Sequence, residues 1–179
     1  MLNLLDPLLS KHSFWYIIGR YVGDGWQRKN YGKDKTYRGG IIICCSKKKE
    51  SDYIKLKNAF DDCKFKVVET EERTSKRLAV YSVELYDFVE RYSKTAIAKI
   101  IDGDTLNLPV ELLEEFVKGY ADSDGTFTQD KFKLTSINTN LIYSTAQAIS
   151  KVYHTHYHIY HAKMPDTHII EGRVVNQKD

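Results

Sequence analysis

Cysteine, net charge and long apolar runs are all scarce in this chain. Three cysteines occur in 179 residues, two of them adjacent, and their spacing matches neither a disulfide framework nor a zinc site. No apolar run approaches the roughly 20 residues of a membrane span, and the first nine residues carry Asp6 and no basic leader. We therefore expect a reduced, cytoplasmic protein, nuclear or organellar in a eukaryotic host, with no membrane partner.

A net charge of only +3 says nothing by itself about nucleic acid. Hydrophobic residues make up 42% of the chain, which is enough for a real core in a single domain or in two similar halves. The charge is unevenly spread, because residues 26–49 hold eight basic residues against one acid. Taken alone, such a cluster is typical of a solvated face.

A short pattern occurs twice, as IIGRYVGDGW in residues 17–26 and FVKGYADSDGTF in residues 116–127. Each copy reads as an apolar helix that ends in an acid and a glycine, with Asp24 and Asp124 in matching places. A calcium loop is excluded, because its sixth and twelfth positions hold Phe127 and Lys133 instead of glycine and glutamate. One copy would favour a simple helix cap, but two copies in matching elements do not.

The elements around the two motifs repeat as well. Periodicity and turn residues predict a helix, a hairpin, a helix, two strands and a helix at 14–23, 26–45, 51–63, 65–70, 77–84 and 85–94. From residue 106 they predict a helix, a hairpin, a helix and a strand at 108–125, 126–136, 138–153 and 155–162, and then a strand or long loop at 167–175. This order indicates a duplication within one domain, 1–179, with halves 13–103 and 104–179, the second incomplete. We also expect Gly25 to end its helix in a left-handed conformation, and Asn138 or Asn140 to cap the helix at 138–153.

Small residues on both motif helices predict how the helices meet. Gly19 and Gly23 share one helix face, and Gly119 and Ser123 repeat that face, so the two backbones can pack closely about an approximate two-fold axis. The two acids would then emerge together at the negative ends of the helix dipoles. A divalent cation, Mg²⁺ or Mn²⁺, is the natural compensation, and it would suit phosphodiester hydrolysis.

On these two motifs the chain resembles the LAGLIDADG homing endonucleases, in the single-chain, intein-like form with two motifs. The resemblance implies an α+β fold of two αββαββα units whose saddle-shaped antiparallel sheets straddle double-stranded DNA. It makes Asp24 and Asp124 the catalytic, metal-binding acids of an enzyme that makes a staggered double-strand cut in a long, specific site. By the same likeness Lys99, 25 residues before Asp124, matches a catalytic lysine of intein-borne members, although the usual proline is missing; the alternative is a surface lysine.

The resemblance also concerns the end of the chain. The stretch IIEGRVVNQKD resembles the loop before the last strand of intein-type members, so the second repeat should be truncated there. We expect the last strand and a second-half counterpart of Lys99 to be absent. The chain would then be a truncated reading frame, a fragment or one part of a split protein. Of all the expectations, this truncation argues most against full cutting activity.

The predicted strands carry the residues expected to contact DNA, since arginine, glutamine and asparagine can read base edges and lysine anchors phosphate. They are Gln27, Arg28, Lys29, Asn30, Lys33, Lys35, Tyr37 and Arg38 in the first hairpin, Arg73, Lys76 and Arg77 near the charged turn, Thr126, Thr128, Gln129, Lys131 and Lys133 in the second hairpin, and His154, His156 and His158 further on. For the three histidines, zinc binding or plain exposure are the alternatives.

The leading hypothesis is therefore a monomeric, metal-dependent DNA endonuclease of the kind that mobilises introns or inteins. The alternative is a binder of the same fold that does not cut, either an RNA maturase or a decayed nuclease. Self-splicing is not expected, because the chain has no initial Cys or Ser and no terminal His-Asn pair.

Overall fold

The computed structural model describes residues 5–31, 37–92, 98–128, 131–136, 138–161, 167–170 and 173–176. Its first half contains α1 (His12–Asp24), β1 (Gly25–Tyr31), β2 (Tyr37–Ser46), α2 (Glu50–Asp62), β3 (Val67–Glu71), β4 (Ser75–Val80) and α3 (Val83–Val89), with short 3-10 turns at Asp6–Leu8 and Glu90–Tyr92. The second half contains α4 (Gly103–Leu106), α5 (Val110–Asp124), β5 (Gly125–Thr128), β6 (Lys131–Leu134), α6 (Thr139–Tyr153), β7 (Thr167–Ile170) and β8 (Arg173–Asn176). The predicted α+β class is confirmed.

The first four strands form one antiparallel sheet in the order β1-β2-β4-β3. Side chains alternate between the two faces of a sheet, and the face with Ile41, Ile43 and Leu78 is fully buried. Helices α1, α2 and α3 all contact β2, and so they cover this inner face. The opposite, outer face carries Trp26, which is 37% exposed, beside Ile42 and Ala79, which are buried.

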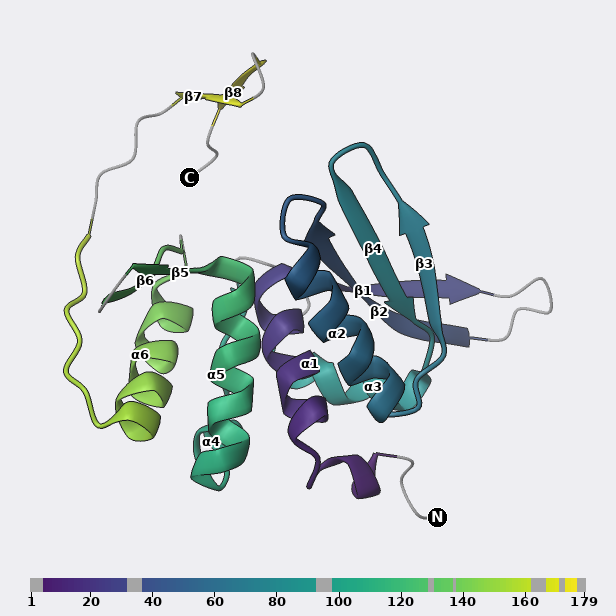
Figure 1. Cartoon of the computed structure of the whole chain (residues 1–179), viewed down its shortest axis with the longest axis horizontal. Helices are drawn as coiled ribbons and strands as arrows, with labels where there is room; N and C mark the ends of the chain where they lie inside the picture. Colours follow the sequence, from purple (N-terminus) through teal and green to yellow (C-terminus); the bar gives the residue numbers. More distant parts are fainter. Residues whose placement is uncertain are drawn as a thin grey trace.

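The two motif helices, α1 and α5, lie side by side at the centre of the molecule, with α2 on one flank and α6 on the other (Figure 1). A side chain at Gly19 would overlap the carbonyl of Phe116, and one at Gly119 would overlap the carbonyl of Tyr16. A side chain at Gly23 would overlap Ser123. Small residues at these places therefore let the backbones touch, and the two helices end next to each other.

Four details of the sequence prediction are wrong. Residues 169–170 and 173–176, expected in a loop before an absent last strand, belong to β7 and β8, which pair with each other. Gly25 does not end α1 in a left-handed conformation; its φ of −98° and ψ of 159° are extended, because it already begins β1. Residues 155–161 form no strand: none of the described sheets pairs with them, and Tyr157 and Tyr160 remain exposed. The helix predicted at 85–94 begins at Val83, because the Ser82 side chain caps it by accepting from the Leu85 N–H, and it gives way to a 3-10 turn after Val89.

The second half builds its strands differently from the first. Its strands pair as two separate hairpins, β5-β6 and β7-β8, rather than as one four-stranded sheet like that of the first half. Each of these strands has only four residues, which leaves a short edge for further pairing. Asn138, not Asn140, caps α6 by accepting a hydrogen bond from the Leu141 N–H at 3.1 Å. None of the described helices is long and apolar enough to cross a membrane.

Candidate active site

Asp24 and Asp124 are the last residues of the two central helices. The residues before them, Gly23 and Ser123, are in contact across the seam between α1 and α5, so both acids emerge at the same end of the helix pair. Asp24 keeps 40% of its side chain exposed, and Asp124 is exposed. Both carboxylates are therefore held by the packed helices and remain open to a ligand.

The charges around the two acids identify them as neighbours. Partial burial raises the pKa of both carboxyl groups, and the charge of Asp24 raises the pKa of Asp124 further. Arg20 and Lys99 act in the opposite direction on each acid. Two carboxylates that repel each other between two cations form a compact, nearly neutral site.

Lys99 is buried beside the acids and is not the surface lysine of the alternative prediction, since its exposed fraction is 5%. Its ammonium donates hydrogen bonds to the carbonyls of Tyr21 at 3.1 Å, Gly23 at 3.1 Å and Gly25 at 2.8 Å. An ammonium has three N–H donors, so all of them are used at the end of α1. Burial lowers the pKa of Lys99 to about 8, although Asp124 and Asp24 both raise it.

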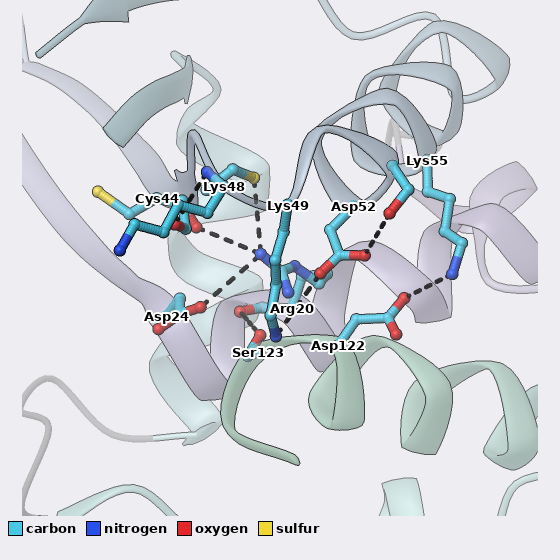
Figure 2. Close-up of polar contacts among 12 residues, drawn as sticks. Arg20, Asp24, Cys44, Lys48, Lys49, Asp52, Lys55, Asp122 and Ser123 are labelled. Atoms are coloured by element: carbon cyan, nitrogen blue, oxygen red, sulfur yellow. Dashed lines mark hydrogen bonds and ion pairs between the residues drawn. The ribbon is translucent and has the colours of Figure 1, made fainter. Parts of the chain in front are cut away.

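Arg20 is a polar residue of the site that the sequence analysis missed. It lies one turn before Asp24 on α1 and is 2% exposed. Its Nη2 atom donates to the carbonyl of Cys44 at 3.3 Å and lies 3.7 Å from Asp24 Oδ2 (Figure 2). An arginine inside an otherwise apolar helix was the signal that could have found it.

Asp122, two residues before Asp124 on α5, is the centre of a second polar cluster. The Tyr16 hydroxyl donates to Asp122 Oδ2 at 2.9 Å, and Lys55 pairs with the same oxygen at 3.2 Å (Figure 2 shows the lysine contact). Burial, together with the Asp122 charge, raises the pKa of Tyr16. This cluster joins α1, α2 and α5, and it leaves Asp122 engaged rather than available to a ligand.

The donor set of Asp24 and Asp124 fits a hard divalent cation. Mg²⁺ is commonly bound through one or two carboxylates, with water and substrate phosphate supplying the remaining oxygens. No group of three or more His, Cys, Asp or Glu side chains able to hold a metal occurs among the described residues. A site closed entirely by protein ligands, such as structural zinc, therefore finds no support in that part of the chain.

Strand β1 divides the predicted DNA contacts between the two faces of the first sheet. Gln27 donates from Nε2 to the Tyr86 carbonyl at 2.8 Å, and the Lys29 ammonium lies 5.7 Å from the Tyr86 ring centroid. Both side chains are thus directed to the inner face, toward α3. Arg28 lies between them, is exposed, and by alternation belongs to the outer face with Trp26.

Strand β4 makes the same division. Lys76 pairs with Glu50 at 3.1 Å and lies 4.0 Å from the Tyr53 ring centroid, so it is directed to α2 on the inner face. Arg77 lies 5.4 Å from the Trp26 ring centroid on the outer face and pairs with Glu72 at 2.8 Å. The outer face therefore joins an exposed tryptophan to basic groups from two strands.

The remaining predicted contacts are scattered or fall outside the described part of the chain. Arg73 is exposed at the turn between β3 and β4, and Lys133 is exposed on β6. The three histidines are exposed after α6, where His154 has a left-handed φ of 50°. Outside the described residues or side chains lie Asn30, Lys33, Lys35, Tyr37, Arg38, Thr126, Thr128, Gln129 and Lys131.

Comparison with solved structures identifies the fold. The complex of I-DmoI with DNA and Ca matches with a TM-score of 0.58 and 18% identity, over 80% of this chain and 72% of that one. The N-terminal LAGLIDADG domain of DUF199/WhiA matches with a TM-score of 0.50 and 12% identity, over 90% of this chain and 76% of that one. No family model and no curated protein matches the chain. The chain therefore has the LAGLIDADG homing-endonuclease fold, as the two motifs predicted.

Proposed function

We propose that this protein is a site-specific DNA endonuclease that depends on Mg²⁺ or Mn²⁺ and uses Asp24 and Asp124 as its metal ligands. The observation that carries the proposal is the ending of α1 and α5 side by side, with two half-open carboxylates beside each other. The comparison adds support, because I-DmoI has the same fold and was solved with DNA and Ca and with DNA and Mn.

The residues of the chain divide the work. When bound, the metal would supply a water of lowered pKa and charge stabilisation for the leaving oxygen. Asp24 and Asp124 would hold it, and Lys99 would keep the end of α1 fixed beneath them, since its three donors bind main-chain carbonyls. The outer face of the first sheet, with Arg28, Trp26 and Arg77, would contact DNA. Both acids come from one chain, so a monomer suffices.

Cleavage of a plasmid library with long randomised inserts tests the proposal without knowledge of the target. The library is incubated with the protein and Mg²⁺, and the new DNA ends are sequenced. We expect staggered ends that flank a common sequence. EDTA should abolish them, and Asp24→Asn or Asp124→Asn should reduce them by more than about 100-fold, the upper end of what loss of outer-shell partners costs a metal site.

The alternative, a binder of the same fold that does not cut, predicts a different result. Library members would be retained by the protein on a filter, yet no linear product would form at any Mg²⁺ or Mn²⁺ concentration. That outcome would contradict the nuclease and leave an RNA maturase or a decayed nuclease. Identical products from the wild type and both asparagine variants would exclude these acids as the metal site.

A further inference from the structure

We propose that Arg20 is a positioning residue that fixes the carboxylate of Asp24, so that the two acids of the site are unequal and the two DNA strands are cut at different rates. The strand-rate part rests on the proposed function. The positioning part concerns the protein alone and can be tested without DNA or metal.

Arg20 connects the acid of the first half to the sheet beside it. Its Nη2 atom lies 3.7 Å from Asp24 Oδ2, donates to the Cys44 carbonyl at 3.3 Å and lies 3.5 Å from the Cys45 sulfur (Figure 2). The guanidinium thus joins the last turn of α1 to the end of β2. Arg20 is itself 2% exposed and is hydrogen-bonded to β2, so the carboxylate has a partner that is anchored outside α1.

The second half has a different residue in the matching place. Tyr120 lies one turn before Asp124, as Arg20 lies one turn before Asp24, and it is fully buried. A tyrosine offers no positive charge to the acid. Within the described part of the chain no ion pair reaches Asp124, whereas Asp24 has one. Asp124 is also the more exposed of the two acids. Lys99 acts on the pKa of both acids, so the difference between them is the ion pair with Arg20, which only Asp24 has among the described residues.

Packing does not explain an arginine at this position. The Nε and Nη1 atoms of Arg20 are buried and find no hydrogen-bond partner among the described residues. Buried N–H groups without partners cost free energy, and Tyr120 shows that an aromatic side chain can fill the matching space on α5. What distinguishes Arg20 from Tyr120 is the set of contacts made by Nη2. These contacts link the Cys44 carbonyl and the Cys45 sulfur of β2 to the carboxylate of Asp24. Preorganisation of a ligand is the gain that such a contact supplies.

Side-chain scalar couplings of the two aspartates provide the direct test. Three-bond couplings to the carboxyl carbon, measured by NMR on the metal-free protein, report whether each side chain holds one rotamer. We expect one rotamer for Asp24 and averaging for Asp124 in the wild type. Arg20→Met should average Asp24, whereas Tyr120→Met, the same replacement at the matching buried position, should leave Asp24 fixed. Asp24 that stays fixed in Arg20→Met, or is averaged in the wild type, would overturn the proposal.

Arg20→Lys keeps the test decisive if Arg20→Met does not fold. Lysine retains the charge but carries it on a shorter, more flexible side chain, whereas in Arg20 the single atom Nη2 contacts both Asp24 and Cys44. Intermediate averaging of Asp24 is therefore expected, and full retention of one rotamer would show that orientation by the guanidinium is not needed.

The plasmid assay then tests the consequence for cutting. With a target selected by the wild type, nicked open-circular DNA should appear before linear DNA. Arg20→Met should prolong the open-circular stage by about tenfold or more, as loss of outer-shell partners does, and Tyr120→Met should not. Equal slowing of both cuts would overturn the strand asymmetry. If the wild type never cuts, the proposed nuclease function is wrong. The side-chain couplings still test the positioning role of Arg20 in that case.

Discussion

The two halves of the molecule share the order helix, hairpin, helix, hairpin but differ in how their strands pair. The first half carries a four-stranded sheet covered by three helices, whereas the second carries two separate hairpins of four-residue strands. The helix ends, by contrast, match residue for residue across the seam. The difference teaches that the seam brings the two acids together, while a DNA surface depends on sheets that only the first half builds in full.

The largest structural effect should come from filling the seam. Gly19→Leu and Gly119→Leu each direct a bulky side chain into the backbone of the opposite helix. We expect each to lower the free energy of unfolding by at least about 3 kcal/mol, the upper end for overpacking, because a helix backbone cannot move aside. Chemical denaturation followed by circular dichroism measures this.

Gly103→Ala is the matched control for the seam variants, since nothing lies within 4 Å of a methyl group added there. We expect a change of less than about 1 kcal/mol. The comparison of the halves requires similar losses from Gly19→Leu and Gly119→Leu. A loss at one glycine only would show that the helices do not pack through a symmetric seam.

The elements that occur in both halves were predicted correctly, because the repeated motif can be recognised directly in the sequence. The two motif helices, their small residues and the hairpin after each were predicted from spacing, and α1 and α5 end at the expected acids. The cap of α6 was also among the predicted choices, since asparagine before an apolar run offers an acceptor to free N–H groups. Local chemistry and period therefore sufficed for the two motif helices and for the hairpin and helix that follow each of them.

The sequence did not predict what depends on contacts between distant residues. The environment of Lys99 arises because its side chain reaches α1 across 74 to 78 positions of the chain. The faces of Gln27 and Lys76 follow from where α3 and α2 cover the sheet, and alternation within one strand does not say which face is covered. An arginine in an apolar helix was a visible signal, but its contacts with β2 and with Asp24 arise only in the fold.

Lys99 sharpens the comparison, because it caps α1 and no hydrogen bond among the described residues does the same for α5. Lys99→Met removes three hydrogen bonds from a buried cation. Hydrogen bonds to charged groups contribute about 1.5–3 kcal/mol, so we expect a loss of stability of about 2 kcal/mol and cleavage slowed by about tenfold. Denaturation curves and single-turnover cleavage measure the two effects.

Lys151→Met is the control for Lys99→Met. The Lys151 ammonium donates to the Leu106 carbonyl at 2.7 Å but is exposed, so its removal should change stability by less than about 0.5 kcal/mol. If Lys99→Met cleaved DNA at the wild-type rate, Lys99 would be a structural residue only, and the hydrogen bonds that it makes at the end of α1 would not matter for cleavage.

The smallest effect tests whether the outer face of the first sheet is the one that contacts DNA. Arg28 and Lys29 are neighbours of equal charge, but Arg28 is directed outward and Lys29 lies over Tyr86 on the inner face. If Arg28 neutralises one phosphate, Arg28→Ala should reduce the slope of log affinity against log salt by about 0.9, and Lys29→Ala should leave the slope unchanged. Fluorescence anisotropy with a labelled duplex at several salt concentrations measures both. Because the two variants lose the same charge, a general field effect would lower both slopes equally, and that result would count against the outer face.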